Sequence, residues 1–478
     1  MTLPAQLPSI EVKTMFPSGK RFVFTGISCA ILLVGLQAAG SVMGWAAEKE
    51  EAWIDPATKY RPDAGIQSFH VQRDGRTDTT KALQGMIDAG IGSIILPRGN
   101  YRITEPLVVD LDKVGCTSIT GDGTARIVMA GPGPAIKFIG THEGSADPKT
   151  VKPNVWHKQR MPLVEGIEIV GTHEEADGIE AVKTMQLTIS RVVIRHVRHA
   201  VHLVERNRNV VISACHFYEN RGVGVYLDDV NLHQINITGS HISYNAGGGV
   251  VSKGGNTRNI QISGCDLEQN VQNVLIDSGG TKYGTAEVAV TGCTLQHSGG
   301  PNSANVRFIG AKPEGERCWG LVTIANNILS DVETNVDIQK ARDVIVTGNT
   351  ISSGYKYNLR VEDSSNVVIG PNVLGRNAPY RDEDTCENGV LLRNCDDGTI
   401  SGLHVHEVLR AGAGIILDKC RRIHVSGCTV LDCDNAAILL NEVEGCRVAD
   451  NLLAHKNASG DKWQKIEVVG GKDNVIEP

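Results

Sequence analysis

The sequence Asn209-Val-Val-Ile-Ser-Ala-Cys215 decides the fold, because it returns as Gln234-Ile-Asn-Ile-Thr-Gly-Ser240 and as Asn259-Ile-Gln-Ile-Ser-Gly-Cys265. Related stretches follow downstream at 287–293, 343–349, 366–372 and 422–428. A period of roughly 22 to 31 residues is typical of stacked supersecondary units, each of which contacts only its neighbours. Residues at equivalent positions of the repeat are therefore expected to lie next to one another in space.

Each repeat contains two short runs in which apolar and polar residues alternate. Ile235 and Ile237 belong to the first kind of run, and Val225 and Leu227 to the second. A period of two with many β-branched residues is typical of strands that have one buried face. Strands that return in the same direction pair with their counterparts one repeat away, at about 4.8 Å. We therefore predict an all-β fold, a parallel β-helix of roughly 11 or 12 coils.

The seventh position of the repeat carries small or amide side chains that we expect to stack in a column. Its members are Cys215, Ser240, Cys265, Cys293, Asn327, Asn349, Asn372, Leu403, Cys428 and Asn451. Such side chains can hydrogen-bond to the turns above and below and so satisfy buried backbone amides. The cysteines are then buried thiols. Cys395 and Cys420 share another register, and a disulfide between them is an alternative.

The N-terminus carries a targeting signal. Lys20 and Arg21 precede an uncharged apolar run over 22–47, which ends before the acidic residue Glu48. This order is typical of a secretory signal peptide. The run is also long enough to span a bilayer. We expect export to the periplasm, the medium or the cell surface, with residues 1–47 either cleaved or kept as a membrane anchor, the protein's one contact with a membrane.

The remaining chain divides into three further parts. Residues 48–110 are predicted to form an N-terminal cap and the first strands, with an amphipathic helix over 79–89 followed by a strand. Residues 111–470 form the β-helix, and residues 471–478 a C-terminal tail. The segment 141–160 is polar and out of period, and we expect a long loop beside the first coils. The net charge is −7, with acidic and basic residues mixed along the chain, and this argues against binding to nucleic acid, which requires a basic surface.

The stretch Asp74-Gly-Arg-Thr-Asp78, followed by Leu96-Pro-Arg-Gly-Asn-Tyr101, resembles the N-terminal motif of the pectate-lyase-like superfamily. The likeness covers roughly residues 65–470 and implies a right-handed parallel β-helix, the usual hand of parallel crossovers. Members of this superfamily include pectate lyases, polygalacturonases, epimerases, phage tailspikes and non-catalytic proteins. The resemblance therefore implies a polysaccharide partner without fixing the chemistry. The catalytic signatures of the polygalacturonases and alginate epimerases are absent as such from this sequence.

Residues between the buried positions of the second run are predicted to point outward in two columns. The first column reads Glu180, His202, Tyr226, Val251, Leu275, Arg307, Asp337, Arg360, Leu391, Ile416 and Leu439. The second reads Val182, Val204, Asp228, Lys253, Asp277, Ile309, Gln339, Glu362, Arg393, Asp418 and Asn441. Ionisable groups concentrate in coils two to eight. Such a face suits an extended, hydroxyl-rich chain such as an acidic polysaccharide.

One interpretation is a lyase that works by β-elimination. His202 or Lys253 would remove the proton next to a uronate carboxylate, and Tyr226 would serve as the acid or its helper. Arg307 or Arg360 would bind the carboxylate. Glu180 and Asp337 complete the predicted substrate-binding set. The resemblance also implies Ca²⁺, which Asp228 and Asp277 could hold. His142, His157 and His173 lie in or near the loop over the first coils and could contribute to a site with Glu180 and His202.

A second interpretation is a glycoside hydrolase with two carboxylates. Asp228 and Asp277 lie two coils apart, about 9.6 Å, which is near the upper limit for an inverting enzyme. Asp337 is a third candidate. A non-catalytic carbohydrate-binding or cell-surface structural protein remains the alternative from another class. The other histidines, including His233, are expected to be ordinary surface or satisfied residues.

Overall fold

The computed structural model describes residues 65–311, 319–377, 385–456 and 463–477. The predicted signal peptide or anchor, residues 1–47, lies outside the described residues. Among the helices that are described, none has the length and apolar character needed to cross a membrane. The described residues form a right-handed parallel β-helix of about 15 turns. The predicted all-β fold class is confirmed.

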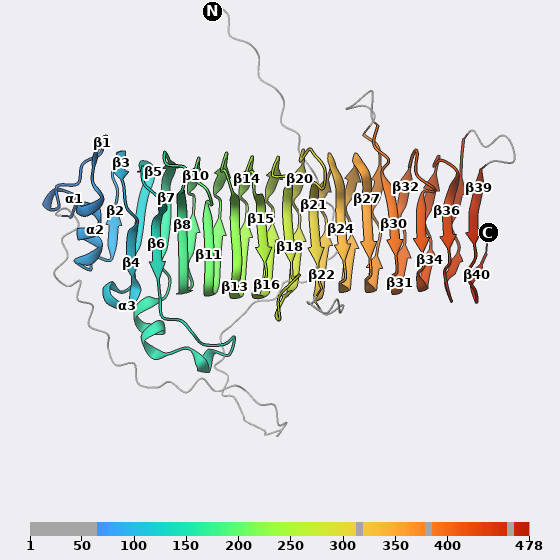
Figure 1. The fold of residues 1–478 in the computed structure, drawn as a ribbon, viewed down its shortest axis with the longest axis horizontal. Coiled ribbons are helices and arrows are strands. Elements are labelled where there is room, and N and C mark those ends of the chain that lie inside the picture. Colours follow the sequence, from blue (N-terminus) through green and yellow to red (C-terminus); the bar gives the residue numbers. More distant parts are fainter. Residues whose placement is uncertain (1–64, 312–318, 378–384, 457–462, 478) are drawn as a thin grey trace, which may run out of the picture. The chain divides into compact units, whose positions relative to one another are not determined.

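Three parallel sheets run along the stack, and Figure 1 shows their strands side by side in successive turns. Sheet A contains β4 (Leu107–Asp110), β6 (Gly133–Ile139), β8 (Ala176–Met185), the first parts of β11 (Val201–Ser213) and β13 (Val223–Thr238), β15 (Gly248–Lys253), β18 (Gln272–Asp277), β21 (Ala304–Ile309), β24 (Val332–Gln339), β27 (Gly354–Glu362), β30 (Gly389–Arg393), β33 (Ile415–Asp418), β36 (Ala436–Asn441) and β39 (Gln464–Val469).

Sheets B and C complete each turn. Sheet B contains β2 (Ser93–Ile95), the first parts of β5 (Ser118–Met129) and β7 (Leu163–Gly171), β9 (Thr188–Ser190), the second parts of β11 and β13, β16 (Asn256–Ser263), β19 (Thr285–Thr291), β22 (Gly320–Ala325), β25 (Arg342–Thr347), β28 (Ser365–Ile369), β31 (Asp396–Ser401), β34 (Arg421–Ser426), β37 (Arg447–Ala449) and β40 (Val475–Ile476). Sheet C contains β1 (Asp74–Asp78), β3 (Gly99–Ile103), the second parts of β5 and β7, β10 (Val193–Arg195), β12 (His216–Tyr218), β14 (His241–Ser243), β17 (Asp266–Glu268), β20 (Thr294–Gln296), β23 (Ile328–Leu329), β26 (Thr350–Ser352), β29 (Val373–Gly375), β32 (His404–His406), β35 (Thr429–Leu431) and β38 (Leu452–Ala454).

The strand register is the one predicted from the repeat. Tyr226 pairs with His202 on one side and Val251 on the other, and Asp228 pairs with Lys253. Both predicted columns of sheet A are in register from Glu180 and Val182 onward. The stack has about 15 turns and not the predicted 11 or 12, because the first strands predicted within 48–110 join it and one strand lies beyond residue 470. The strands β1 to β4 precede residue 111, and β40, after residue 470, pairs with β37.

The core is a continuous file of aliphatic side chains inside the three sheets. Val225, Leu227, Ile235 and Ile237 of one turn are all fully buried. Their outward neighbours alternate with them, as period two requires. At the corner between sheets A and B, the left-handed conformation of Asn209 (φ 53°) turns the chain from one sheet into the next. The low aromatic content follows from this thin, layered interior.

The stacked column at the seventh repeat position forms the predicted hydrogen bonds. The backbone N–H of Asn327 donates to Asn349 Oδ1 at 2.9 Å, and that of Asn349 donates to Asn372 Oδ1 at 2.9 Å. A second amide ladder was not predicted. Its contacts run through Asn220, Asn245, Asn270, Asn273, Asn305, Asn335 and Asn358. These ladders satisfy amides inside the turns and tie each turn to the next.

The cysteines in these columns are buried thiols. Cys215 Sγ donates to the carbonyl of Ser213 at 3.2 Å, and burial raises the pKa of its thiol to about 11. At the second register, Cys420 and Cys395 hydrogen-bond through their sulfurs, which raises the pKa of Cys420. The geometry therefore favours stacked thiols over the disulfide considered as an alternative.

Short helices close the first turns and cover one flank. The helix α1 (Gly65–Ser68) precedes β1, and α2 (Thr80–Asp88) is the predicted amphipathic helix, which buries Leu83, Met86 and Ile87. The helix α3 (Leu111–Val114) follows β4. The predicted loop over 141–160 contains a 3-10 turn, Pro148–Thr150, and a short π-helix, Val155–Gln159. Val151 and Val155 pack with Met185 of β8, so this segment is anchored to the solenoid.

Candidate functional site

A cluster of titratable side chains lies on sheet A where β8, β11 and β13 run side by side. Glu180, His202 and Tyr226 occupy the same outward column on three successive turns. Asp228 belongs to the neighbouring column, on the same strand as Tyr226. The alternation of the strands directs all four side chains to the same outer face. The structure therefore brings together four of the residues predicted from the sequence.

His202 lies between two carboxylates. Its Nε2 donates to Asp228 Oδ2 at 3.1 Å, and its Nδ1 is 3.8 Å from Glu180 Oε2. The Nδ1 atom is buried and has no hydrogen-bond partner. The side chain of Asp228 is 40% exposed, whereas that of His202 is only 14% exposed. A molecule on the sheet would therefore reach Asp228 before it reached the imidazole.

Tyr226 stacks on His202 with ring centroids 5.3 Å apart and an interplanar angle of 5°. Burial and the adjacent Asp228 carboxylate raise the pKa of Tyr226 to about 12, so its hydroxyl stays protonated and can donate a hydrogen bond. His199, at the start of this turn, contacts both rings. Burial lowers the pKa of His199 to about 4, which keeps it neutral at pH 7. The cluster thus combines a proton donor, the Tyr226 hydroxyl, with an exposed carboxylate, Asp228.

Lys137 of β6 connects this cluster to a hollow at the edge of sheet A. Its Nζ lies 2.7 Å from Glu180 Oε1. The hollow has a volume of about 350 Å³, and it is lined by Lys137, Ile139, Gly140, Thr141, Glu143, Val182, Lys183 and Glu205. The segment 141–160 therefore provides one wall beside the carboxylate–histidine cluster. This volume lies at the lower end of the range of small-molecule sites.

Lys253 and Asp277 continue the column of Asp228 on the next two turns. Lys253 is exposed. Asp277 Oδ1 accepts the backbone N–H of Gly279 at 2.8 Å. These residues do not fit the calcium site considered from the sequence. Lys253 lies between Asp228 and Asp277 in register, and its positive charge would repel a calcium ion bound there. Within the described ranges, no group of three or more His, Cys, Asp or Glu residues could hold a metal ion.

Further along sheet A, three residues of the predicted binding set bind one another. Asp337 is fully buried and accepts from Arg307 Nε at 2.5 Å. It also accepts from Arg360 Nε at 2.9 Å and Nη2 at 2.7 Å. These ion pairs hold the pKa of Asp337 below its usual range, despite its burial. Arg307 and Arg360 are therefore occupied by a carboxylate of the protein itself.

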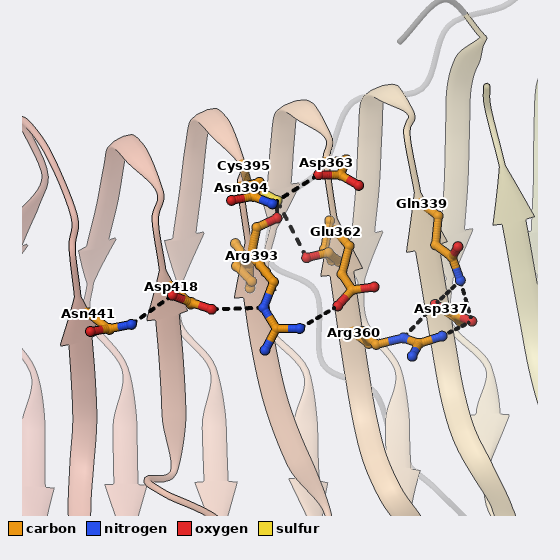
Figure 2. Close-up of polar contacts among 12 residues, drawn as sticks. Asp337, Gln339, Arg360, Glu362, Asp363, Arg393, Asn394, Cys395, Asp418 and Asn441 are labelled. Atoms are coloured by element: carbon orange, nitrogen blue, oxygen red, sulfur yellow. Dashed lines mark hydrogen bonds and ion pairs between the residues drawn. The ribbon is translucent and has the colours of Figure 1, made fainter. Parts of the chain in front are cut away.

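The paired charges continue toward the C-terminal end, as Figure 2 shows. Arg393 Nη1 donates to Glu362 Oε1 at 3.2 Å, and its Nε donates to Asp418 Oδ2 at 2.8 Å. Asn441 then donates to Asp418 Oδ1 at 2.8 Å. We call the residues Arg307, Asp337, Gln339, Arg360, Glu362, Arg393, Asp418 and Asn441 the ion ladder. Its groups satisfy one another across the turns.

Several polar residues of this flank were not predicted. Lys137 could have been found by extending the outward column one turn upstream, because it pairs with Glu180. His199 precedes its strand, and the alternation gives no signal for it. His142, considered as a partner of His202, is instead buried near Arg206 and Arg208, and burial together with these two cations lowers its pKa to about 4. The N–H of Glu175 donates to His173 Nδ1 at 3.1 Å, so His173 caps a turn.

Two family models match separate parts of the chain. Residues 159–295 match the model described as "Right handed beta helix region". Residues 320–467 match the model described as "Periplasmic copper-binding protein (NosD)". No curated protein matches the sequence significantly. The first match agrees with the strand pairing and confirms the right-handed parallel β-helix that the resemblance implied.

Solved structures with a similar arrangement come from proteins of different activities. A mannuronan C-5 epimerase A-module from Azotobacter vinelandii is 12% identical, with a TM-score of 0.40 over 86% of this chain and 99% of that one. A surface protein and adhesin from Streptococcus pneumoniae is 12% identical, with a TM-score of 0.45 over 85% of this chain and 99% of the other. An alpha-1,3-glucanase from Streptomyces thermodiastaticus is also 12% identical, with a TM-score of 0.37 over 87% and 69%.

Proposed function

We propose that this right-handed parallel β-helix protein, which has the pectate-lyase-like fold, is exported and acts on an acidic polysaccharide as a lyase. The observation that carries the proposal is the cluster of His202, Tyr226 and Asp228 on an exposed sheet face. An enzyme needs a proton acceptor and a proton donor in reach of the same bond, with shifted protonation equilibria. The cluster offers both within two neighbouring turns.

In this proposal Asp228 accepts the proton, because its carboxylate is more exposed than the side chains of His202 and Glu180. The proton lies on the carbon next to the uronate carboxylate, and its removal lets a carbon–carbon double bond form. The glycosidic carbon–oxygen bond breaks, and the Tyr226 hydroxyl protonates the leaving oxygen. His202 holds Asp228 through its Nε2–H and is a positioning residue here, since its own Nδ1 is buried.

Lys253 is the group best placed to bind the uronate carboxylate. It is exposed, adjoins Asp228 in register, and makes no ion pair with a described residue. A cation at this point would also favour proton removal, because it stabilises the negative charge that develops on the carboxylate. Arg307 and Arg360, the clamps expected from the sequence, already bind Asp337. Lys253 therefore takes that role in the proposal.

Hydrolysis is less well supported. It requires two carboxylates that flank the sugar bond, with space for a water molecule between them. Asp228 binds His202, Asp277 binds the backbone of Gly279, and Lys253 lies between the two in register. The ion ladder favours a different second candidate, a protein that only binds carbohydrate. Its rows of paired charges offer hydrogen bonds to hydroxyl groups without a reactive carboxylate.

Export rests on two supports. The basic and apolar N-terminus predicts secretion or anchoring. The family model that matches residues 320–467 is described as periplasmic.

A panel of uronate and neutral polysaccharides tests the proposal. A lyase gives an unsaturated product that absorbs in the ultraviolet, and Tyr226→Phe should slow its formation by about 100-fold or more. Tyr244→Phe is the matched control, because Tyr244 is 55% exposed and lies outside the cluster. New reducing ends without ultraviolet absorbance would replace the lyase with a hydrolase. Binding of a polymer without either signal would support the carbohydrate-binding alternative.

A further inference from the structure

A second polar cluster lies where sheet A turns into sheet B, beneath residues 142–147. Arg208, His233 and Arg258 occupy one column on three successive turns, and Arg206 lies beside them in register with Asn231. A hollow of about 160 Å³ opens here. Ser145, Arg206, Asn231, His233, Asn256 and Arg258 are among the residues that line it. It lies at the corner between the sheets, beside rather than within the Asp228 cluster.

The cluster is rich in cations that lack counter-charges. None of Arg206, Arg208 and Arg258 forms an ion pair with a described carboxylate. Asp147 and Glu287 are the acidic groups whose fields reach the cluster, and both remain beyond ion-pair distance. Burial and the mutual repulsion of Arg206 and Arg208 lower the pKa of Arg206. An arginine does not lose its proton in a protein, so the positive charge persists.

Several side-chain nitrogens at this corner, among them two arginine N–H donors, have no hydrogen-bond partner. They are buried and belong to Arg206 (Nε), Arg208 (Nε), His233 (Nδ1) and His142 (both ring nitrogens). Arg208 is only 6% exposed and His142 only 1% exposed. A buried polar group without a partner destabilises a protein, and a charged one does so more strongly. Such a concentration at one point indicates a missing acceptor.

The two flanking arginines hold the walls of the hollow. Arg208 Nη1 donates to the carbonyl of Ser145 at 2.7 Å. Arg258 Nη1 donates to the carbonyls of Thr257 and Gly284, and its guanidinium lies 4.7 Å from the ring of Trp319. Arg206 and His233 make no side-chain hydrogen bond. Both side chains line the hollow and remain available to a ligand.

We propose that this corner hollow binds a single oxyanion: a carboxylate, sulfate or phosphate group. An oxyanion supplies several acceptor oxygens and a negative charge, which the arginines and histidines lack. The hollow is smaller than the usual small-molecule site of about 300–1,000 Å³, so it accommodates a charged group rather than a sugar chain. Arg206 and His233 bind the anion, and Arg208 and Arg258 stabilise it by charge.

Calorimetric titration and thermal unfolding of the full chain test this site. The probes are sodium sulfate, sodium phosphate, sodium glucuronate and glucose 6-sulfate, with glucose and sodium chloride as controls at equal ionic strength. Wild-type protein should bind at least one oxyanion and melt at a higher temperature with it, because a ligand that binds only the folded state stabilises it. Arg206→Gln should raise the Kd at least tenfold.

Two further variants separate binding from folding. His233→Gln should also raise the Kd, by about threefold or more, while Arg191→Gln, an exposed arginine paired with Glu165, should leave it unchanged. In oxyanion-free buffer Arg206→Gln should melt no lower than wild type, because it removes a repulsion from Arg208. Equal stabilisation of wild type and Arg206→Gln, or the failure of every oxyanion to bind, would overturn the site.

The probes also identify the source of the oxyanion. Tighter binding of glucuronate or glucose 6-sulfate than of the free ions by tenfold indicates a group carried on a sugar, and equal binding indicates a free ion. The site is independent of the lyase proposal. Oxyanion binding without polymer cleavage would support this site and reject the lyase proposal. Polymer cleavage without oxyanion binding would support the lyase proposal and reject this site.

Discussion

Two regions of sheet A carry the same two outward columns, but their charged side chains differ in exposure and in pairing. In the upstream turns, Asp228 is 40% exposed and His202 Nδ1 has no hydrogen-bond partner. In the downstream turns, Asp337 is fully buried and bound by two arginines. The sequence places ionisable side chains in these columns in both regions. A binding site is therefore distinguished by groups that remain available to a ligand, whereas charges that pair with one another contribute to stability.

The largest expected effect comes from exchanging one carboxylate in each region. Asp228→Asn should lower the rate of polymer cleavage by roughly 100- to 10,000-fold, because the proton acceptor is lost while the shape is kept. Asp418→Asn, in the same column of the ion ladder, should retain the wild-type rate. The measurement is kcat/KM from the ultraviolet signal. A comparable loss in both variants would erase the distinction between the two regions.

The second expected effect concerns folding stability, and here the downstream region is the more sensitive one. Asp337→Asn should lower the free energy of unfolding by about 3–5 kcal/mol, because it leaves Arg307 and Arg360 buried without a carboxylate. Asp397→Asn should change it by no more than about 1 kcal/mol, since Asp397 pairs with Arg422 at the exposed surface. Denaturant unfolding followed by circular dichroism measures both. A small effect at Asp337 would show that the ladder is not a stabilising element.

The smallest effect is a difference in acid sensitivity. His142 and His199 have pKa values lowered to about 4, so between pH 6.5 and 4 the unfolded chain binds more protons than the folded one. Stability of the upstream turns is therefore lost progressively as the pH falls through this window. Asp337 has a lowered pKa, so its contribution to folding stability is lost only when the pH falls below about 3.8, the ordinary pKa of an aspartate.

Hydrogen exchange at pH 6.5, 5 and 4 checks this order. The turns around residues 137–228 should lose protection first, and those around 332–441 should remain protected. The double variant His142→Gln/His199→Gln should reduce the pH dependence upstream. Uniform loss of protection along the stack would contradict the assignment of acid sensitivity to these two histidines.

The sequence allowed the register to be predicted, since the repeat length and the alternation leave one way to align neighbouring turns. Tyr226 and Val251 are adjacent for this reason. The pairing of Arg307 with Asp337 could also have been inferred, because opposite charges on adjacent turns of one column lie within reach. The sequence interpretation instead treated both as groups free to bind a substrate.

Other parts of the site could not be predicted from the repeat. Segment 141–160 is out of period, so the sequence did not indicate that His142 would be buried near Arg206 rather than near His202. His233 was expected to be an ordinary histidine, but its Nδ1 is buried without a partner, and it lines a hollow together with Ser145 of the same segment. Burial beneath a non-repeating segment depends on tertiary packing, so the alternation of apolar and polar residues does not predict it.

The amide ladders have a consequence for how such a protein can change in size. Asn349 accepts from the backbone N–H of Asn327 in one turn, and its own backbone N–H and Nδ2 donate to Asn372 in the next. A duplicated turn would bring its own matching donor and acceptor, and the old contacts would re-form on either side of the insertion. The molecule can therefore grow or shrink by whole turns during evolution, while changes of a few residues are confined to the loops between strands.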